Sequence, residues 1–316
     1  MQRTIKNSVT FQSVALHSGK LTRITLRPQA PNVGIVFKRT DLPSEPIIPG
    51  LASQVLDTIL ATRLGSPTHS ISTVEHLLAA VYSFGISNLL VEVDGPEIPI
   101  ADGSSLPFLV MLDEAGIETQ GVPSRFLRVK SPLEVVCPKD PTRFIRIEPS
   151  KHTQITYTID FAEKSIGSQT MELKLSGETL AREILFARTF CRFHEIEYLK
   201  SRGLAQGGSL ENAVVVGNSG GSILNRNGLR AENEFVRHKI LDCVGDLALV
   251  GMPVVGSIYA HKAGHDLHTA LAKKLEILAK TQAETVDVRS KKSFSLQFPE
   301  SLRQLGIGLN FNPVVG

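Results

Sequence analysis

The apolar positions of the N-terminal part follow two spacings, which predict strands mixed with helices. Residues 3–11 and 20–27 alternate in strand fashion on either side of the turn LHSGK, and VGIVFKR and SNLLVEVDG have the same pattern. STVEHLLAAVYSFGI and SSLPFLVMLDEAGI carry apolar residues at helical spacing. We expect Ser72 or Thr73 to cap the first of these helices, and Ser104 or Ser105 the second. The pattern predicts one α+β unit.

The pattern restarts after GVPSRFLRVKSPLEVVCP, a segment with Pro and Arg that begins at residue 121. Strand patterns follow in RFIRIEP and QITYTIDF, and helices are predicted at about 231–248 and 264–280. No repeat is visible in the sequence, although two similar halves would agree with an old duplication. We predict an α+β fold with domains at 1–124 and 125–290, followed by a tail at 291–316.

Composition and charge narrow the class of protein. The chain has 316 residues, 42% hydrophobic and 21% charged, as expected for a globular protein with a sizeable core. Its net charge of +3 is dispersed, so we expect no nucleic-acid partner, although a local basic patch for a phosphorylated ligand is compatible with it. Without a signal-peptide pattern or a run of about eighteen apolar residues, we expect a cytoplasmic protein with no membrane span. Its three cysteines have no paired spacing, which argues against disulfides.

A polar stripe runs through the otherwise apolar segment FVRHKILDCVGDLALVG, residues 235–251. His238, Asp242 and Asp246 are spaced by four, so on an α-helix they lie on one face. Because these side chains are costly to bury, the stripe is expected to have a partner.

His238 and Asp242 have the spacing of a helical pair of zinc ligands, and a third ligand would come from a distant segment. STVEHLLAA offers His76, with Glu75 beside it and able to reach the open side of a metal. Alone, the His-x-x-x-Asp pair also suits a salt-bridged pair on a solvated face. The apolar neighbours of Asp242, together with the second segment, favour a metal site.

A further histidine segment is HKAGHDLHTALAKKL. His265 follows Gly264 at a predicted helix start, where the helix dipole disfavours a protonated ring unless a carboxylate compensates. Asp246 can supply that carboxylate. Taken alone, His265 would equally suit a helix-capping residue.

Six segments together resemble the LpxC family, the UDP-3-O-acyl-N-acetylglucosamine deacetylases of lipid A biosynthesis. They occur in the family's order and are STVEHLLAA, GPEIPIADGSS, ARTFC, SRGLAQGGSLENAVVV, EFVRHKILDCVGDLALVG and AGHDLHTAL. The resemblance implies two similar domains, each a layered sheet-and-helix sandwich, with the active site between them. It also implies hydrolysis of the N-acetyl amide of UDP-3-O-acyl-N-acetylglucosamine, a small-molecule substrate.

The resemblance also assigns roles to residues. It implies Zn²⁺ held by His76, His238 and Asp242, with Glu75 as the general base acting on a metal-bound water. His265, held by Asp246, would stabilise the oxyanion and assist the leaving amine. Thr189 would donate a hydrogen bond to the acetyl oxygen, and Lys239 would contact substrate. Fe²⁺ can occupy the same ligands in the cell. We expect a monomer.

The family's acyl-binding insertion maps to about 190–223. Phe190 would contact substrate, and the walls of an apolar passage would include Phe193, Ile196, Gly208 and Val215. These apolar residues also suit an ordinary core, and Arg192 and His194 leave the details of the passage open. The resemblance does not cover the tail, and the preferred acyl length is not readable.

Two other functions use the same residues. A two-His-one-carboxylate set also serves Fe(II) oxygenases, but those sites usually lie on strands of a β-barrel, whereas these ligands are predicted on helices. A non-catalytic sugar-nucleotide binding protein would be expected to have lost its base, yet Glu75 is present. Both observations favour the deacetylase.

Overall fold

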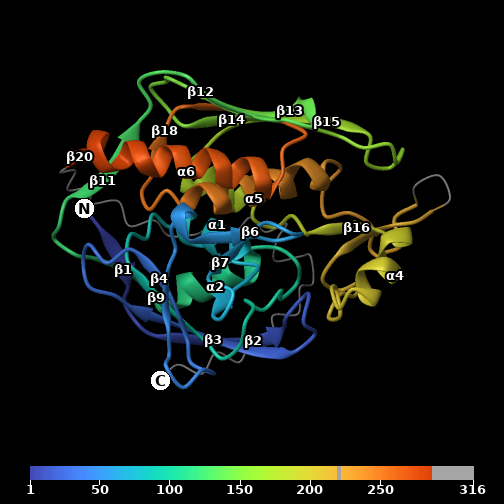
Figure 1. The fold of residues 1–316 in the computed structure, drawn as a ribbon, viewed down its shortest axis with the longest axis horizontal. Coiled ribbons are helices and arrows are strands. Elements are labelled where there is room, and N and C mark those ends of the chain that lie inside the picture. Colours follow the sequence, from blue (N-terminus) through green and yellow to red (C-terminus); the bar gives the residue numbers. More distant parts are fainter. Residues whose placement is uncertain (219–221, 287–316) are drawn as a thin grey trace.

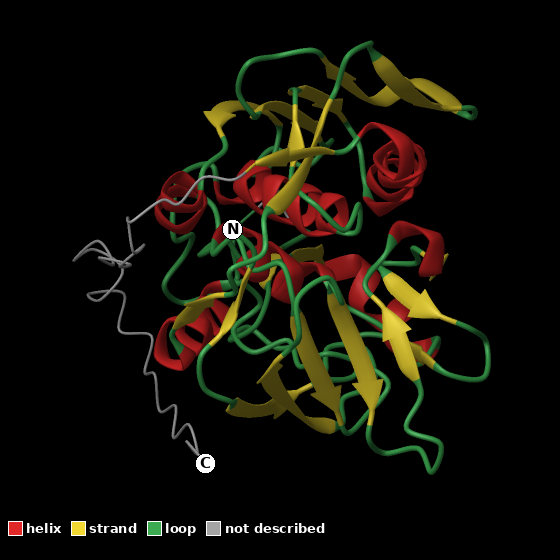
Figure 2. Ribbon diagram, turned by 90° about the vertical axis from the view of Figure 1, so that its left-hand side faces the viewer, coloured by secondary structure: helices red, strands yellow, loops and turns green. Residues whose placement is uncertain are grey.

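A computed structural model describes residues 1–218 and 222–286 and has an α+β fold (Figure 1). Two five-stranded sheets form outer layers, and helices α1 (Glu75–Ser83), α5 (Glu234–Ala248) and α6 (His265–Gln282) lie between them. The view turned by 90° also places most helices between the sheets (Figure 2). The predicted fold class is confirmed, and the predicted tail at 291–316 lies outside the described residues.

The first sheet has the order β2-β3-β9-β4-β5. Its strands are β2 (Val9–Val14), β3 (Leu21–Pro28), β4 (Ile35–Arg39), β5 (Ile47–Pro49) and β9 (Leu89–Val93). β9 comes last in sequence yet lies at the centre, antiparallel to β3 and parallel to β4. Alternate residues of β3 are buried, among them Ile24 and Leu26, so one face of the sheet packs on the core.

The second sheet has the order β12-β13-β19-β14-β15. Its strands are β12 (Leu133–Cys137), β13 (Asp140–Glu148), β14 (Gln154–Asp160), β15 (Ser168–Lys174) and β19 (Ser257–His261). Here too the last strand lies at the centre, antiparallel to β13 and parallel to β14. The two sheets therefore share one topology, as a duplication would produce. The predicted division after residue 124 cuts β11 (Ser124–Arg128) after its first residue, and the domain limits remain a prediction.

Smaller elements complete the fold. β1 (Arg3–Ile5) pairs with β10 (Ile117–Thr119), and β11 pairs with β18 (Val254–Val255) and β20 (Glu284–Val286). A three-stranded sheet consists of β6 (Val55–Asp57), β7 (Arg63–Gly65) and β8 (Ser70–Ile71). The remaining elements are η1 (Ala52–Gln54), α2 (Leu106–Ala115), α3 (Gly177–Glu183), β16 (Phe190–Arg192), α4 (Phe193–Ser201) and β17 (Val214–Val216). Within the described ranges, no helix is long and apolar enough to cross a membrane.

Helices α1 and α5 pack backbone to backbone at Gly245. A Cβ atom at this position would lie 2.1 Å from the carbonyl oxygen of Glu75 and 2.9 Å from its Cα. Because real Cβ atoms do not come so close to backbone, only glycine permits this packing. The contact places the first turn of α1 beside the polar stripe of α5.

The predicted cap of α1 is wrong. The helix begins at Glu75 after Val74, and no side chain caps it. Thr73 has a positive φ of 61°, and its hydroxyl donates to Glu97 Oε1 at 3.2 Å. The hydroxyl is therefore used in a tertiary contact that its position in the sequence does not reveal.

The predicted cap of α2 is partly correct. Ser105 occupies the N-cap position, but its hydroxyl donates to the His76 carbonyl at 2.7 Å instead of capping the helix. The Ser104 hydroxyl accepts a hydrogen bond from the Leu106 N–H at 3.2 Å. The two serines thus satisfy one free N–H of α2 and one carbonyl of α1.

Candidate metal and active site

Three predicted ligands come together in the structure although His76 lies far from the other two in sequence. The Nε2 atoms of His76 and His238 lie 3.6 and 3.3 Å from Asp242 Oδ1. All three side chains are buried, and their ligand atoms lie within 4.8 Å of one another. α1 supplies His76, and one face of α5 supplies the i, i+4 pair.

The chemistry of these atoms suits a metal ion. His238 Nδ1 lies 3.1 Å from the Ala187 carbonyl oxygen, which can only accept, so Nδ1 carries the hydrogen and Nε2 keeps its lone pair. Burial lowers the pKa of His238 to about 3, which keeps the ring neutral. Asp242 Oδ1 is buried and accepts no hydrogen bond from the part of the chain that the structure describes. A divalent cation would satisfy this oxygen together with the two Nε2 atoms that face it.

Glu75 lies beside this group without belonging to it. Its Oε2 accepts a hydrogen bond from the Thr62 N–H at 3.1 Å, and its Oε1 lies 4.0 Å from His265 Nε2. Burial raises the pKa of Glu75, and the positive charge of His265 opposes the rise. The carboxylate is therefore a stronger base than an exposed glutamate.

His265 begins α6, as predicted, and Asp246 holds it. His265 Nδ1 donates to Asp246 Oδ2 at 2.7 Å, which leaves Nε2 facing Glu75 and Asp242. Burial alone lowers the pKa of His265, but the charge and hydrogen bond of Asp246 outweigh burial and raise the pKa to about 9. The ring is thus protonated at neutral pH despite its place at a helix N-terminus.

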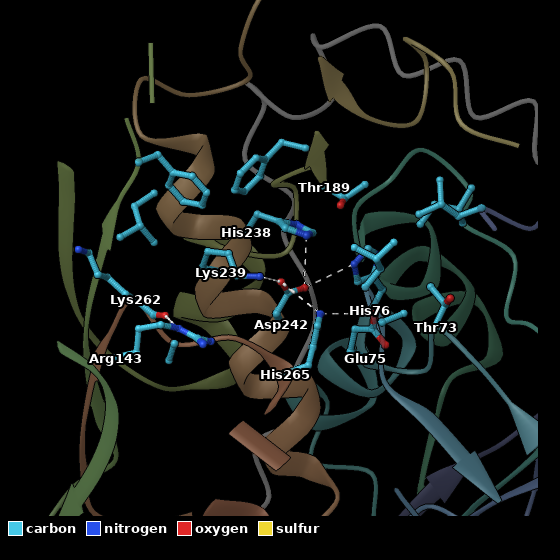
Figure 3. A pocket seen from close by; sticks show the side chains of 18 of the residues that line it. Thr73, Glu75, His76, Arg143, Thr189, His238, Lys239, Asp242, Lys262 and His265 are labelled. Atoms are coloured by element: carbon cyan, nitrogen blue, oxygen red, sulfur yellow. Dashed lines mark hydrogen bonds and ion pairs between the residues drawn. The ribbon is translucent and has the colours of Figure 1, made fainter. Parts of the chain in front are cut away.

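Lys239 and Thr189 approach the same space from two sides. The Lys239 ammonium forms an ion pair with Asp242 Oδ2. Thr189 precedes β16, and its N–H donates to the Gly103 carbonyl at 2.8 Å. Both residues line the pocket that contains the metal-ligand candidates (Figure 3).

The pocket has a volume of about 540 Å³. Residues from both the N-terminal and the C-terminal half of the chain line it. Figure 3 shows His76, His238, Asp242 and His265 directed toward one another, with Arg143 and Lys262 at one side. Sequence reasoning missed these two cations. Arg143 pairs with Asp266 at 3.0 Å, and Lys262 pairs with Asp160 at 2.9 Å.

Of the residues assigned to the acyl passage, the pocket wall includes Phe190 alone. Its ring packs on Phe161 and Phe235, with centroids 5.6 and 5.0 Å apart. Val215 is buried in β17, whereas Phe193 on α4 is 49% exposed.

The other two positions lie nearby. Ile196 is half-buried on α4. A Cβ atom at Gly208 would lie 3.7 Å from Leu16 Cδ1, and Leu16 does line the pocket. Residues 219–221 of the assigned insertion lie outside the described ranges, and the passage remains a prediction.

Sequence reasoning also missed Thr62 and Gly245. The Thr62 hydroxyl donates to Asp246 and its N–H to Glu75, so one residue contacts both carboxylates. No local pattern reveals such a tertiary role. Gly245 did carry a signal, since a glycine inside an apolar helix usually has a packing reason.

The fold and this site define an α+β protein with a candidate two-His-one-Asp metal centre and an adjacent carboxylate. A model of the LpxC family, described as UDP-3-O-acyl N-acetylglycosamine deacetylase, matches residues 2–276. The chain belongs to this family.

Relatives with the name UDP-3-O-acyl-N-acetylglucosamine deacetylase are similar over most of their length. The protein of Syntrophus aciditrophicus is 46% identical over 274 residues, which cover 87% of this chain and 85% of the relative. The protein of Myxococcus xanthus is 44% identical over 316 residues, covering 100% and 95%. That of Citrifermentans bemidjiense is 42% identical over 304 residues, covering 96% and 97%.

Proposed function

We propose that this chain removes the N-acetyl group from UDP-3-O-acyl-N-acetylglucosamine in lipid A biosynthesis, as a Zn²⁺-dependent hydrolase. The observation that carries the proposal is the buried group of His76, His238 and Asp242, with the Glu75 carboxylate and His265 Nε2 directed at the same space. Family membership and the names of the relatives support the substrate.

His76, His238 and Asp242 would hold the metal ion. When bound, Zn²⁺ would acidify a coordinated water and polarise the acetyl carbonyl. The protein contributes the neutral state of His238, which burial favours, and its tautomer, which the Ala187 carbonyl fixes by accepting from Nδ1–H. Fe²⁺ suits the same donor set, and metal analysis of the purified protein distinguishes the two.

Glu75 and His265 would divide the proton transfers between them. Glu75 would take a proton from the attacking water, because burial raises its pKa and its ion pair within the described residues, with His265 Nε2, is as long as 4.0 Å. His265 would hold its proton at Nε2 and give it to the amine as the C–N bond breaks. The two groups lie 4.0 Å apart, so one bound amide can contact both.

The remaining pocket residues would bind and orient the substrate. The Thr189 side chain would donate to the acetyl oxygen, where negative charge develops. Lys239 would contact substrate. Arg143 and Lys262, at one side of the pocket, would bind the negatively charged diphosphate of the nucleotide. Phe190 would contact the acyl chain, with the 190–223 segment continuing the apolar passage.

The proposal is tested with metal-depleted protein reloaded with Zn²⁺ and incubated with UDP-3-O-acyl-N-acetylglucosamine. We expect stoichiometric release of acetate and a product lighter by one acetyl group, measured by mass spectrometry. Oxygen consumption without acetate release would instead indicate oxygenase chemistry, and tight binding without turnover would indicate a sugar-nucleotide binding protein.

Other expectations from the sequence remain predictions. They are a monomeric state, a cytoplasmic location and the domain limits given above. Light scattering on the purified chain tests the first, and fractionation of cells tests the second.

A further inference from the structure

Asp246 is surrounded by three polar side chains, and its support of His265 accounts for only one of these contacts. Its Oδ1 accepts the Thr62 hydroxyl. Its Oδ2 lies 2.7 Å from His265 Nδ1 and 2.9 Å from His268 Nδ1. His265 and His268 are spaced i, i+3 on α6, so both rings face the same carboxylate.

His268 is fully buried and does not line the pocket, so it does not contact substrate. Its second ring nitrogen, Nε2, lies 2.9 Å from the Tyr157 hydroxyl, and that hydroxyl also lies 2.8 Å from the Ala263 carbonyl oxygen. A chain of contacts therefore runs from Tyr157 on β14 through His268 and Asp246 to His265.

The hydrogen-bond partners of His268 show that its Nδ1 carries a hydrogen. If Nε2 of a neutral ring carried the hydrogen, the bare lone pair of Nδ1 would face the Asp246 carboxylate at 2.9 Å, which is repulsive. Burial lowers the pKa of His268, which favours the neutral ring. The Tyr157 hydroxyl has a single hydrogen and donates it to the Ala263 carbonyl oxygen, which can only accept. The Asp246 carboxylate also only accepts, so its contact with the ring requires a hydrogen on His268 Nδ1, which donates to Asp246.

We infer that His268 is a positioning residue for the reaction: its Nδ1–H fixes the Asp246 carboxylate in the orientation that directs His265 Nε2 into the active site. The inference rests on the proposed function for its effect on rate, and on hydrogen-bond geometry for the arrangement itself. Asp246 lies on α5, whereas both histidines lie on α6, so the shared oxygen also aligns the two helices.

Two amide substitutions separate the ring's two nitrogens. In His268→Asn the side-chain nitrogen can occupy the position of Nδ1 and keep the bond to Asp246. In His268→Gln the amide reaches the position of Nε2 near Tyr157, and the donor to Asp246 is lost. We expect kcat to fall roughly 10–100-fold in His268→Gln, as for other residues that orient a catalytic group, and His268→Asn to restore most of it.

KM should change little in either variant, because His268 does not reach the pocket. Metal content and the melting temperature of both variants show whether a loss of rate comes from an altered fold. Equal kcat in wild type and a folded His268→Gln would overturn the inference, as would failure of His268→Asn to exceed His268→Gln.

The wild-type ring provides a measurement that needs neither turnover nor a stable variant. In protein with ¹⁵N-labelled histidine, we expect a His268 signal with hydrogen on Nδ1 and slow exchange with solvent. A ring with hydrogen on Nε2 and none on Nδ1 would overturn the inference. If wild type released no acetate, the proposed function would fail, while this spectrum would still decide the arrangement at Asp246.

Discussion

Glu75 and Asp242 are two carboxylates in one pocket whose surroundings give them different tasks. Burial raises the pKa of both, but at Asp242 the positive charges of Lys239 and His265 oppose burial, and its pKa lies well below the usual value. At Glu75 the more distant His265 and, to a smaller extent, His76 oppose burial without outweighing it, so its pKa is raised. The pair therefore separates into a permanent anion, suited to bind a metal, and a carboxylate with a raised pKa, suited to act as a base.

This separation predicts the behaviour of Glu75→Gln. The amide keeps the shape of the side chain but cannot accept a proton, so kcat should fall roughly 10²–10⁴-fold while bound Zn²⁺ stays at the wild-type level. Activity and metal content are measured on the same preparation. Loss of the metal together with the activity would make Glu75 a ligand or a structural residue.

Removal of a metal ligand should instead lower the metal content together with the activity. In His76→Ala, His238→Ala or Asp242→Ala, we expect bound Zn²⁺ well below one ion per chain and no measurable deacetylation, because two remaining ligands hold the ion weakly. Atomic absorption after dialysis measures the ratio. His69→Ala, which changes an exposed histidine, is the matched control, and full occupancy in any ligand variant would remove that residue from the site.

Among single residues, the sequence predicted those whose role follows from a nearby sequence pattern. The spacing of four placed His238 and Asp242 on one helix face, and the resemblance joined His76 to them. Thr62 and His268 could not be predicted, since their contacts with Asp246 depend on how a strand-rich segment and α6 pack around α5.

At the scale of elements, the crossing of α1 and α5 determines the site. Gly245 lets the Glu75 backbone approach, and the Ser105 hydroxyl binds the His76 carbonyl at 2.7 Å. Both contacts hold the first turn of α1, where no side chain caps the helix. The sequence predicted the two helices but not where they cross, because the crossing depends on the absence of a side chain at Gly245.

Gly245→Ala should therefore lower kcat, although Gly245 does not line the pocket. The new methyl group would lie 2.1 Å from the Glu75 carbonyl oxygen, and the helices must separate to accommodate it. We expect a loss of about 1–3 kcal/mol in the free energy of unfolding. A displacement of about 1 Å at Glu75 should lower kcat roughly 10²-fold.

Urea unfolding and steady-state rates measure the two effects of Gly245→Ala. Gly245→Val should be worse in both, since it adds two further methyl groups at the same contact. A Gly245→Ala protein with wild-type stability and rate would show that the helices can separate without consequence.

For the whole molecule, both sheets insert their last strand between the second and third. The sequence suggested two α+β halves but not this topology, because the central strands β9 and β19 pair with partners far away in the chain. The shared topology places α1 of one half against α5 of the other, so neither half contains the whole ligand set.

The described part of segment 190–223 combines the exposed helix α4 with the buried strand β17. α4 has no buried residue, and Arg192 joins it to Glu163 of the β14–β15 connection by an ion pair of 3.3 Å. An acyl chain bound along this segment would cover apolar side chains that now face solvent, among them Phe193. The length of the acyl chain is therefore expected to affect binding more than chemistry.

A series of substrates with increasing acyl length tests this passage. Each methylene that becomes buried should contribute up to about 0.8 kcal/mol, so kcat/KM should rise in steps until the passage is filled. Gly208→Phe should block long chains and leave a short-chain substrate nearly unaffected, because position 208 faces Leu16 at the pocket wall, away from the metal ligands. Ser201→Phe adds the same ring to an exposed position of α4 and should leave the series unchanged. Equal losses for short and long substrates, in a Gly208→Phe protein that melts as wild type does, would show that residues 190–223 do not form the acyl passage.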